Sequence, residues 1–177
     1  MIDEKLTKKE FPITNVYVYL EAARISAPSK SVHDTLKRYY DTLLENGEDR
    51  DGYDEVADRV RGKYAKLLNA KKKEIAIIKN TTEGINVAAS GLSVKHGENV
   101  VTADLEHRNN AYPWLYLSTK GAEVRVVENQ NFRILTSEII KNIDAKTRAV
   151  GVSHVQFLNG FLADLKSIAE ACKKVGA

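Results

Sequence analysis

The sequence predicts an α/β fold, a three-layer αβα arrangement in which helices cover both faces of a mostly parallel sheet. From residue 74 onward, short apolar runs alternate with segments whose apolar residues recur at three- and four-residue steps. This strand–helix–strand alternation is typical of βαβ units. Polar loops follow the apolar runs, and such sheets hold their ligands at the loops after the strands.

The segment before residue 74 is predicted to be irregular and helical. Residues 1–30 are expected to form an N-terminal arm, with a short β-type run at residues 16–20. A helix is predicted to begin at Ser31, a typical N-cap residue, and to stop at Gly47. A second helix is expected over residues 53–69.

The remaining elements follow in alternation. Strands are expected at residues 74–79, 99–103, 123–127 and 148–153. Helices are expected at residues 82–92, 109–119, 136–143 and from 164 onward. Thr136 and Asp164 are the predicted caps of the last two helices, and Gly176 is the predicted end of the final one.

Composition limits the classes of function. The formal net charge is only +3, so no nucleic acid or membrane is expected as a partner. The charged start MIDEKLTKKE lacks the apolar core of a secretory signal. A single cysteine, Cys172, excludes an internal disulfide framework and is expected to fill the core. These features favour a cytoplasmic protein.

The loop after the first expected strand reads Lys79-Asn-Thr-Thr-Glu-Gly84. Hydroxyls of Thr81 and Thr82, together with free N–H groups at a helix start, suit a phosphate. The alternative is that Thr82 only caps its own helix.

His107 lies in the loop after the next strand, where its ring could stack on an aromatic ligand and move protons near neutral pH. The alternative is a capping or solvated loop histidine. The spacing of His107, His154 and Glu106 does not favour a metal site.

Two amide side chains, Gln156 and Asn159, follow the last expected strand. The three polar loops together form a more specific pattern than any one of them. The glycine fingerprints of dinucleotide and P-loop sites are absent from the sequence.

Five motifs in order resemble the class V aminotransferase family, which includes cysteine desulfurases, selenocysteine lyases and isopenicillin-N-epimerase-like enzymes. The resemblance spans roughly residues 17–177. The motifs are YLEAARISAP at 19–28, NTTEGIN at 80–86, DLEHRNN at 104–110, GAEVRVV at 121–127 and TRAVGVSHVQFLNGFLADL at 147–165.

The resemblance implies a fold type I enzyme that uses pyridoxal 5′-phosphate, with residues 31–177 as the N-terminal part of its large cofactor-binding domain. Thr81 and Thr82 would hold the phosphate, and His107 would stack on the pyridine ring and assist proton movement. Desulfurases have an asparagine that binds the ring oxygen where this chain has Phe157. Gln156, as in the epimerase-like branch, or Asn159 would take that role.

The resemblance also implies an amino-acid substrate and a homodimer, with a transferase, lyase or epimerase type of reaction. The family's Schiff-base lysine, which follows a histidine, and its ring-nitrogen aspartate are expected to lie beyond the segment at hand. No His-Lys dipeptide occurs in the sequence. Without these two residues, this chain alone is expected to be inactive. The helix ending at Gly176 is expected to lead into a further strand. The alternative is a non-catalytic truncated or split-gene fragment that binds phosphate ligands or a complementing chain.

Overall fold

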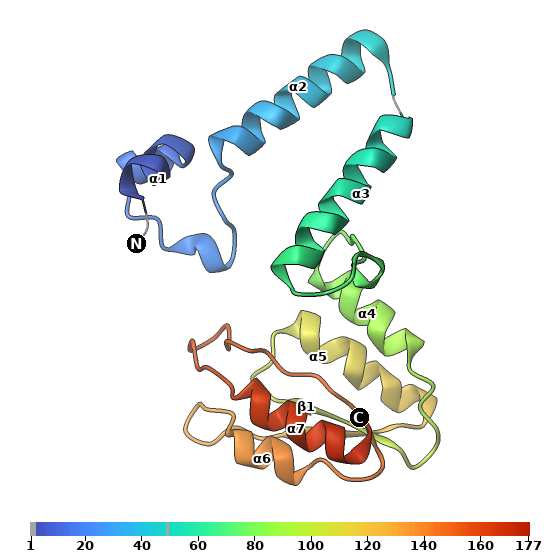
Figure 1. Ribbon diagram of the computed structural model, residues 1–177. Helices are drawn as coiled ribbons and strands as arrows, with labels where there is room; N and C mark the ends of the chain where they lie inside the picture. Colours follow the sequence, from blue (N-terminus) through green and yellow to red (C-terminus); the bar gives the residue numbers. More distant parts are fainter. Residues whose placement is uncertain (1–2, 49) are drawn as a thin grey trace. The chain divides into compact units, whose positions relative to one another are not determined.

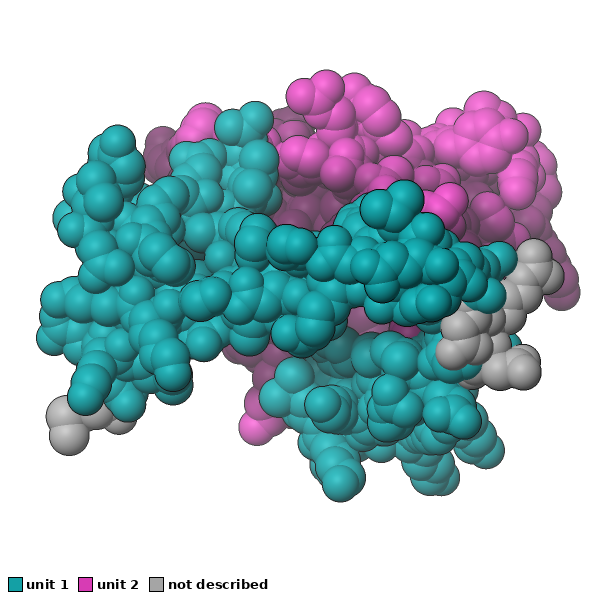
Figure 2. All heavy atoms as spheres, turned by 90° about the horizontal axis from the view of Figure 1, so that it is seen from above, with its two compact units in different colours: residues 1–75 teal, residues 76–177 magenta. Residues whose placement is uncertain are grey.

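The computed structural model describes residues 3–48 and 50–177. The chain divides into two compact units, residues 1–75 and residues 76–177, which Figure 1 shows as ribbons and Figure 2 distinguishes by colour. No helix in the described part of the chain is both long enough and apolar enough to cross a membrane. The expected arm boundary at residue 30 stays a prediction.

The first unit is built from helices and turns. Ser29, not the expected Ser31, caps the first long helix, because its hydroxyl accepts the N–H of Val32 at 3.3 Å. The Ser31 hydroxyl instead donates to Glu10 at 2.6 Å. Gly47 ends this helix with a φ of 76°, which confirms its predicted role. The elements of this unit are α1 (Glu4–Glu10), η1 (Pro12–Asn15), η2 (Glu21–Ala23), α2 (Lys30–Asn46), α3 (Arg50–Leu67) and η3 (Lys72–Glu74).

The second unit carries the sheet. Its strands are β1 (Asn99–Ala103), β2 (Glu123–Val127) and β3 (Thr147–Val150). Its helices are α4 (Thr81–Gly91), α5 (Arg108–Leu115), η4 (Tyr116–Lys120), α6 (Thr136–Lys141) and α7 (Leu165–Val175). The predicted bounds of the two strands at 99–103 and 123–127 are confirmed.

All strands of the sheet are parallel, in the order β2-β1-β3. Asn99 lies opposite both Glu123 and Thr147, and every residue of the central strand β1 is buried. A parallel strand that is buried on both faces is rich in apolar residues, and β1 supplies Val100, Val101 and Ala103, while its buried Asn99 and Thr102 are hydrogen-bonded. The predicted parallel sheet is therefore confirmed.

Helices cover both faces of the sheet, as Figure 1 shows. On one face, Val100 packs with Ala89 of α4 and Trp114 of α5. On the other face, Val101 packs with a cluster that includes Ile139 of α6 and Ile168 of α7. Successive residues of a strand point to opposite faces, so one buried strand supplies both cores. The result is an incomplete αβα fold.

Two expected strands, at residues 16–20 and 74–79, do not form. The chain has no regular secondary structure at 17–20 and 75–78, and residues 79–80 form a bend. A strand needs a hydrogen-bonding neighbour, and among the described residues none pairs with either segment. Ile77 and Ile78 consequently remain 52% and 45% exposed.

The helix caps differ from the predictions in part. Asp164 caps α7 by accepting the N–H of Ser167, and Gly176 ends that helix in the left-handed conformation, which confirms both predictions. Thr136 does not cap α6. It is the first residue of that helix, and its hydroxyl accepts the N–H of Asp164 at 3.4 Å.

A polar network ties the strands together at their amino ends. The Asn99 amide donates to Asp144 at 2.9 Å, and the Thr147 hydroxyl donates to the Asn99 side-chain oxygen at 2.8 Å. Arg125 of β2 forms an ion pair with Asp144 at 2.8 Å. The bonds from Asn99 and Arg125 lower the pKa of Asp144 from its ordinary 3.8 to about 2.

Close packing between α5 and the end of β3 depends on a glycine. Gly151 is buried directly after β3, and a Cβ there would lie 2.1 Å from Nε1 of Trp114. The Trp114 ring therefore occupies the space that any side chain at position 151 would need. This contact fixes α5 against the strand that leads into the loop after β3.

Candidate functional site

The candidate site lies at the carboxyl edge of the sheet, where β1 leads into residues 104–107 and β3 leads into residues 151–164. Parallel neighbouring strands bring these loops to the same edge. The start of α4 belongs to the same unit, because α4 packs against α5.

Glu106 joins the two loops through its buried carboxylate. One oxygen, Oε1, accepts the Ser153 N–H and the Gln156 amide, both at 2.7 Å. The other, Oε2, accepts the Ser153 hydroxyl at 2.5 Å and the Asn110 amide at 2.8 Å. Glu106 is only 8% exposed, and all of these donors are neutral groups. A buried carboxylate needs such donors to offset its lost hydration.

His107 is half-buried and caps α5. Its Nδ1 accepts the N–H of Asn109 at 3.2 Å, so the proton of the neutral ring resides on Nε2. The ring also meets Phe157 edge-on, with centroids 4.8 Å apart and planes 84° apart. The capping alternative for His107 is thus confirmed, and the cap orients the imidazole.

The start of α4 differs from the prediction in its cap. Asn80, not Thr82, is the N-cap, because its side-chain oxygen accepts the N–H of Glu83 at 2.9 Å. The Glu83 carboxylate accepts the N–H of Lys79 at 2.6 Å. Among the described residues, the hydroxyls and N–H groups of Thr81 and Thr82 have no hydrogen-bond partner. They remain as donors at the positive end of a helix.

Thr82 and the residues after His107 line the same open hollow, with a volume of about 390 Å³. α4 contributes Thr82 and Asn86, while α5 contributes Arg108 and Asn109. Tyr112, Pro113 and Tyr116 complete the lining. Of the predicted site residues, only Thr82 lines this hollow, and the residues next to His107, Arg108 and Asn109, line it as well.

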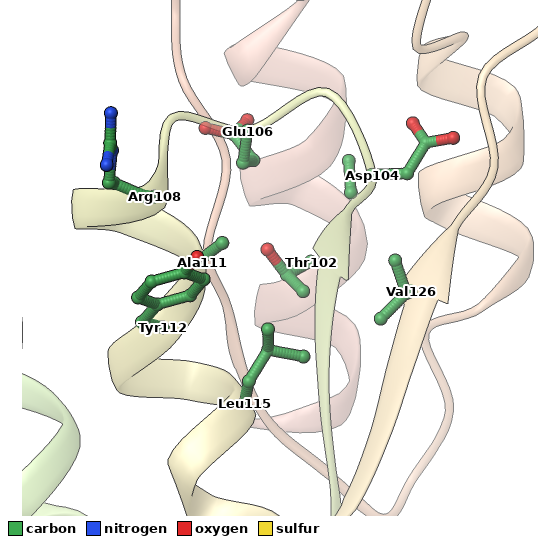
Figure 3. Close-up of a pocket in the computed structure, with 9 residues that line it drawn as sticks. Thr102, Asp104, Glu106, Arg108, Ala111, Tyr112, Leu115 and Val126 are labelled. Atoms are coloured by element: carbon green, nitrogen blue, oxygen red, sulfur yellow. The ribbon is translucent and has the colours of Figure 1, made fainter.

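A second hollow of about 320 Å³ lies between β1, β2 and α5, and Figure 3 shows its lining. Glu106 and Asp104 lie at its loop end, and Thr102 and Leu115 lie deeper, between the strand and the helix. Arg108 lines both hollows.

Gln156 is 3% exposed. Its amide nitrogen donates to Glu106, while its Oε1 is buried without a hydrogen-bond partner. No other described side chain leaves a buried nitrogen or oxygen unpaired. Such an atom is costly unless a water or a ligand satisfies it.

Asn159 is placed differently from the other predicted residues. It is exposed, its amide donates to the carbonyl of Phe132, and its side-chain oxygen accepts the N–H of Phe161 at 2.8 Å. Its hydrogen bonds therefore close the loop after β3 against the loop after β2. It makes no hydrogen bond to Glu106 or Gln156 among the described residues.

Sequence reasoning missed the structural role of Glu106, Ser153 and Asn110. It considered Glu106 only as a possible metal ligand. The described residues hold no cluster of metal-binding side chains. A signal was present, because an acidic residue in the short loop between a buried strand and a predicted ligand-facing histidine needs partners. Asn110 lies four positions further along, but Ser153 and Gln156 lie 47 and 50 positions away and could not be assigned.

The sequence profile of the aminotransferase class-V family matches residues 18–177. The chain is 32% identical to a probable cysteine desulfurase of Methanothermobacter thermautotrophicus, over 96% of this chain and 44% of that protein. It is 34% identical to the uncharacterized protein C11D3.10 of Schizosaccharomyces pombe, over 90% of this chain and 37% of that protein. The chain thus spans less than half the length of these curated relatives.

Solved structures agree with the sequence relatives. The apo cysteine desulfurase of Thermococcus onnurineus has a TM-score of 0.85 at 27% identity, over all of this chain and 46% of that one. A mutant of C-DES, with glycine covalently linked to its PLP cofactor, has a TM-score of 0.84 at 20% identity, over 98% of this chain and 46% of that one. With its profile matched over nearly its whole length, the chain belongs to the class V aminotransferase family, whose cofactor is pyridoxal phosphate.

Proposed function

We propose that residues 1–177 form the cofactor-holding N-terminal part of a pyridoxal phosphate enzyme that acts on an amino-acid substrate. The observation that carries this proposal is the hollow shared by Thr82 and the residues that follow His107. Its lining includes a hydroxyl suited to a phosphate, that of Thr82, and the two residues that follow His107 in the chain.

The described residues fit the chemistry of this cofactor. The unpartnered N–H groups and hydroxyls of Thr81 and Thr82 suit a phosphate, and the dipole of α4 favours a negative charge there. The ring of His107, held by its cap and by Phe157, offers a flat face for a pyridine ring.

Gln156 fits the polar edge of such a ring. One hydrogen of its amide nitrogen goes to Glu106 and the other is free to donate, while its unpartnered Oε1 can accept. Asn159 is held by the loop closure, so we assign the contact with the ring oxygen to Gln156.

When bound, pyridoxal phosphate serves as an electron sink for bond breaking at the α-carbon of an amino acid. This chain's own contribution is to bind the phosphate, to orient the ring and to carry a proton at Nε2 of His107. We infer that the Schiff-base lysine and the aspartate facing the ring nitrogen lie outside residues 1–177, and that the whole enzyme is a homodimer.

The experiment is a titration of the purified chain with pyridoxal phosphate, followed through quenching of its single tryptophan, Trp114. Loss of a hydrogen bond to a charged phosphate should make Thr82→Ala bind about tenfold more weakly. Loss of ring stacking should make His107→Ala bind roughly fivefold more weakly.

Matched variants separate chemistry from general damage. Thr82→Ser keeps the hydroxyl and should bind as the parent does. His33→Ala removes an exposed histidine of α2, remote in sequence from the site loops, and should leave binding unchanged. Equal affinity for Thr82→Ala, His107→Ala and the parent chain would contradict the proposal.

A further inference from the structure

We propose that Glu106 is a positioning residue, whose carboxylate sets His107 and Gln156 in one fixed arrangement. Its importance for cofactor binding rests on the proposed function, whereas its effect on the two loops can be measured without any ligand. The inference starts from the burial of this side chain and from where its hydrogen-bond donors originate.

The donors to Glu106 come from two separate parts of the chain. Asn110 belongs to α5, one helical turn further along, while Ser153 and Gln156 belong to the loop after β3. Each carboxylate oxygen accepts two of the four hydrogen bonds. Both carboxylate oxygens are therefore fully occupied by hydrogen bonds. The carboxylate joins the two loops and is not available to bind a substrate.

This link fixes the neighbours of the residues it joins. Glu106 precedes His107 in the chain, and Gln156 precedes Phe157. The side-chain hydrogen bond between Glu106 and Gln156 is therefore adjacent in the chain to the ring contact between His107 and Phe157. The centroids of these two rings are 4.8 Å apart. Other bonds, such as those of Asn159, close the loop after β3 on itself and against the loop after β2, whereas the Glu106–Gln156 bond joins the residues next to the two rings.

The carboxylate also decides which way the Gln156 amide faces. A carboxylate can only accept, so the amide nitrogen must face Glu106 and Oε1 must face away from it. An amide at position 106 could not accept all four donors, because it has one oxygen and presents its own N–H groups to them. The isosteric variant Glu106→Gln should therefore release Ser153 and Gln156.

The test compares Glu106→Gln with Asp144→Asn in the full 177-residue chain. Asp144 is a matched control because it is a carboxylate that also collects several hydrogen bonds, but at the amino ends of the strands. The first readout is the set of nuclear Overhauser effects between the rings of His107 and Phe157, recorded without ligand. The second is the affinity for pyridoxal phosphate, measured where each variant is fully folded.

Glu106→Gln should lose the ring-to-ring effects and bind the cofactor about tenfold more weakly. Asp144→Asn should keep both properties, with an affinity within about twofold of the parent, since distant sites act independently. Persistence of the ring-to-ring effects in Glu106→Gln, or an unchanged affinity, would overturn the inference. If the parent chain does not bind the cofactor, the proposed function fails, and the ring-to-ring effects alone decide the role of Glu106.

A milder variant keeps the test open if Glu106→Gln does not fold. Ser153→Ala removes only the hydroxyl donor at 2.5 Å and leaves the carboxylate in place. It should weaken the ring-to-ring effects and lower the affinity by about threefold. Glu106→Asp retains the charge and should keep part of the ring-to-ring signal that Glu106→Gln abolishes. A change in packing alone would not produce this difference between the two variants.

Discussion

The amino and carboxyl ends of the same strands are held by carboxylates in different ways. At the amino ends, Asp144 is partly exposed, pairs with the Arg125 guanidinium and accepts from the buried side chain of Asn99. At the carboxyl ends, Glu106 is buried and accepts only from neutral groups. The first arrangement leaves its polar side chains paired, whereas the second includes the unpartnered Oε1 of Gln156.

From this difference we expect the amino ends of the strands to contribute to folding stability and the carboxyl ends to contribute to ligand binding. Fully paired groups contribute to folding and have no capacity left for a ligand. Near the carboxyl ends, Gln156 has an acceptor without a partner, and Thr81 and Thr82 at the start of α4 have donors without a partner among the described residues. We expect substitutions at the amino ends to change the free energy of unfolding alone, and those at the carboxyl ends to change ligand affinity as well.

The largest expected effect on stability is that of Gly151→Ala. The new Cβ would lie 2.1 Å from Nε1 of Trp114, so the helix and the strand must separate. We expect a loss of about 3 kcal/mol in the free energy of unfolding, as for overpacked cores, together with a shift of the Trp114 emission. Urea denaturation followed by fluorescence and by circular dichroism measures both effects. A variant as stable as the parent would show that the Trp114 ring does not lie this close to the backbone of Gly151.

The next effect tests the amino ends directly. Asn99→Ala removes a side chain that is 0% exposed and leaves Thr147 and Asp144 each without one partner. The expected loss in the free energy of unfolding is about 2 kcal/mol. Affinity for pyridoxal phosphate, measured on the folded fraction, should not change. A substantial loss of affinity at unchanged stability would contradict the expectation that the amino ends affect stability alone.

The dependence of stability on acid pH tests the role of Asp144 at the amino ends of the strands. The pKa of Asp144 is about 2 in the folded chain against an ordinary 3.8, so the folded state binds this proton less readily than the unfolded state. The stabilisation from Asp144 is therefore complete above its ordinary pKa and is lost as the pH falls from about 4 to 2. Unfolding midpoints recorded between pH 5 and pH 2 should fall less steeply for Asp144→Asn than for the parent. Parallel curves would contradict the role of this ion pair.

The smallest expected effect is that of Gly84→Ala in α4. A Cβ there meets only the far end of the Ile78 side chain, which can rotate away. The gain in helix propensity offsets this contact, so the free energy of unfolding should stay within about 0.5 kcal/mol of the parent. The same substitution at Gly151 is the matched comparison. Similar losses at the two glycines would show that backbone freedom, rather than the Trp114 contact, sets the effect.

The sequence predicts two of the strands, at 99–103 and 123–127, with their observed bounds, because their signals are local. Both are short segments rich in valine, and the predicted strand at 148–153 is observed at Thr147–Val150. Asp164 and Gly176 are recognisable because a cap depends only on its own helix end.

The features that the sequence did not predict depend on residues far apart in the chain, or on which of two neighbouring residues with similar side chains takes a role. Residues 74–79 have strand composition, but pairing requires a neighbour that the described chain does not supply. Asn80 and Thr82 both have capping side chains, and the sequence alone does not choose between them. The link between Glu106 and Gln156 spans 50 positions and arises only when the loops meet.

The unpaired segment at residues 75–78 has a consequence for handling the protein. It combines β-branched apolar residues with backbone N–H groups of Ala76, Ile77 and Ile78 that have no partner among the described residues. An exposed segment with β-branched residues and unpaired backbone groups readily pairs with the same segment of another molecule. Concentrated solutions of the isolated chain should therefore form intermolecular β-structure through these residues, and a lysine in place of Ile77 should delay that aggregation.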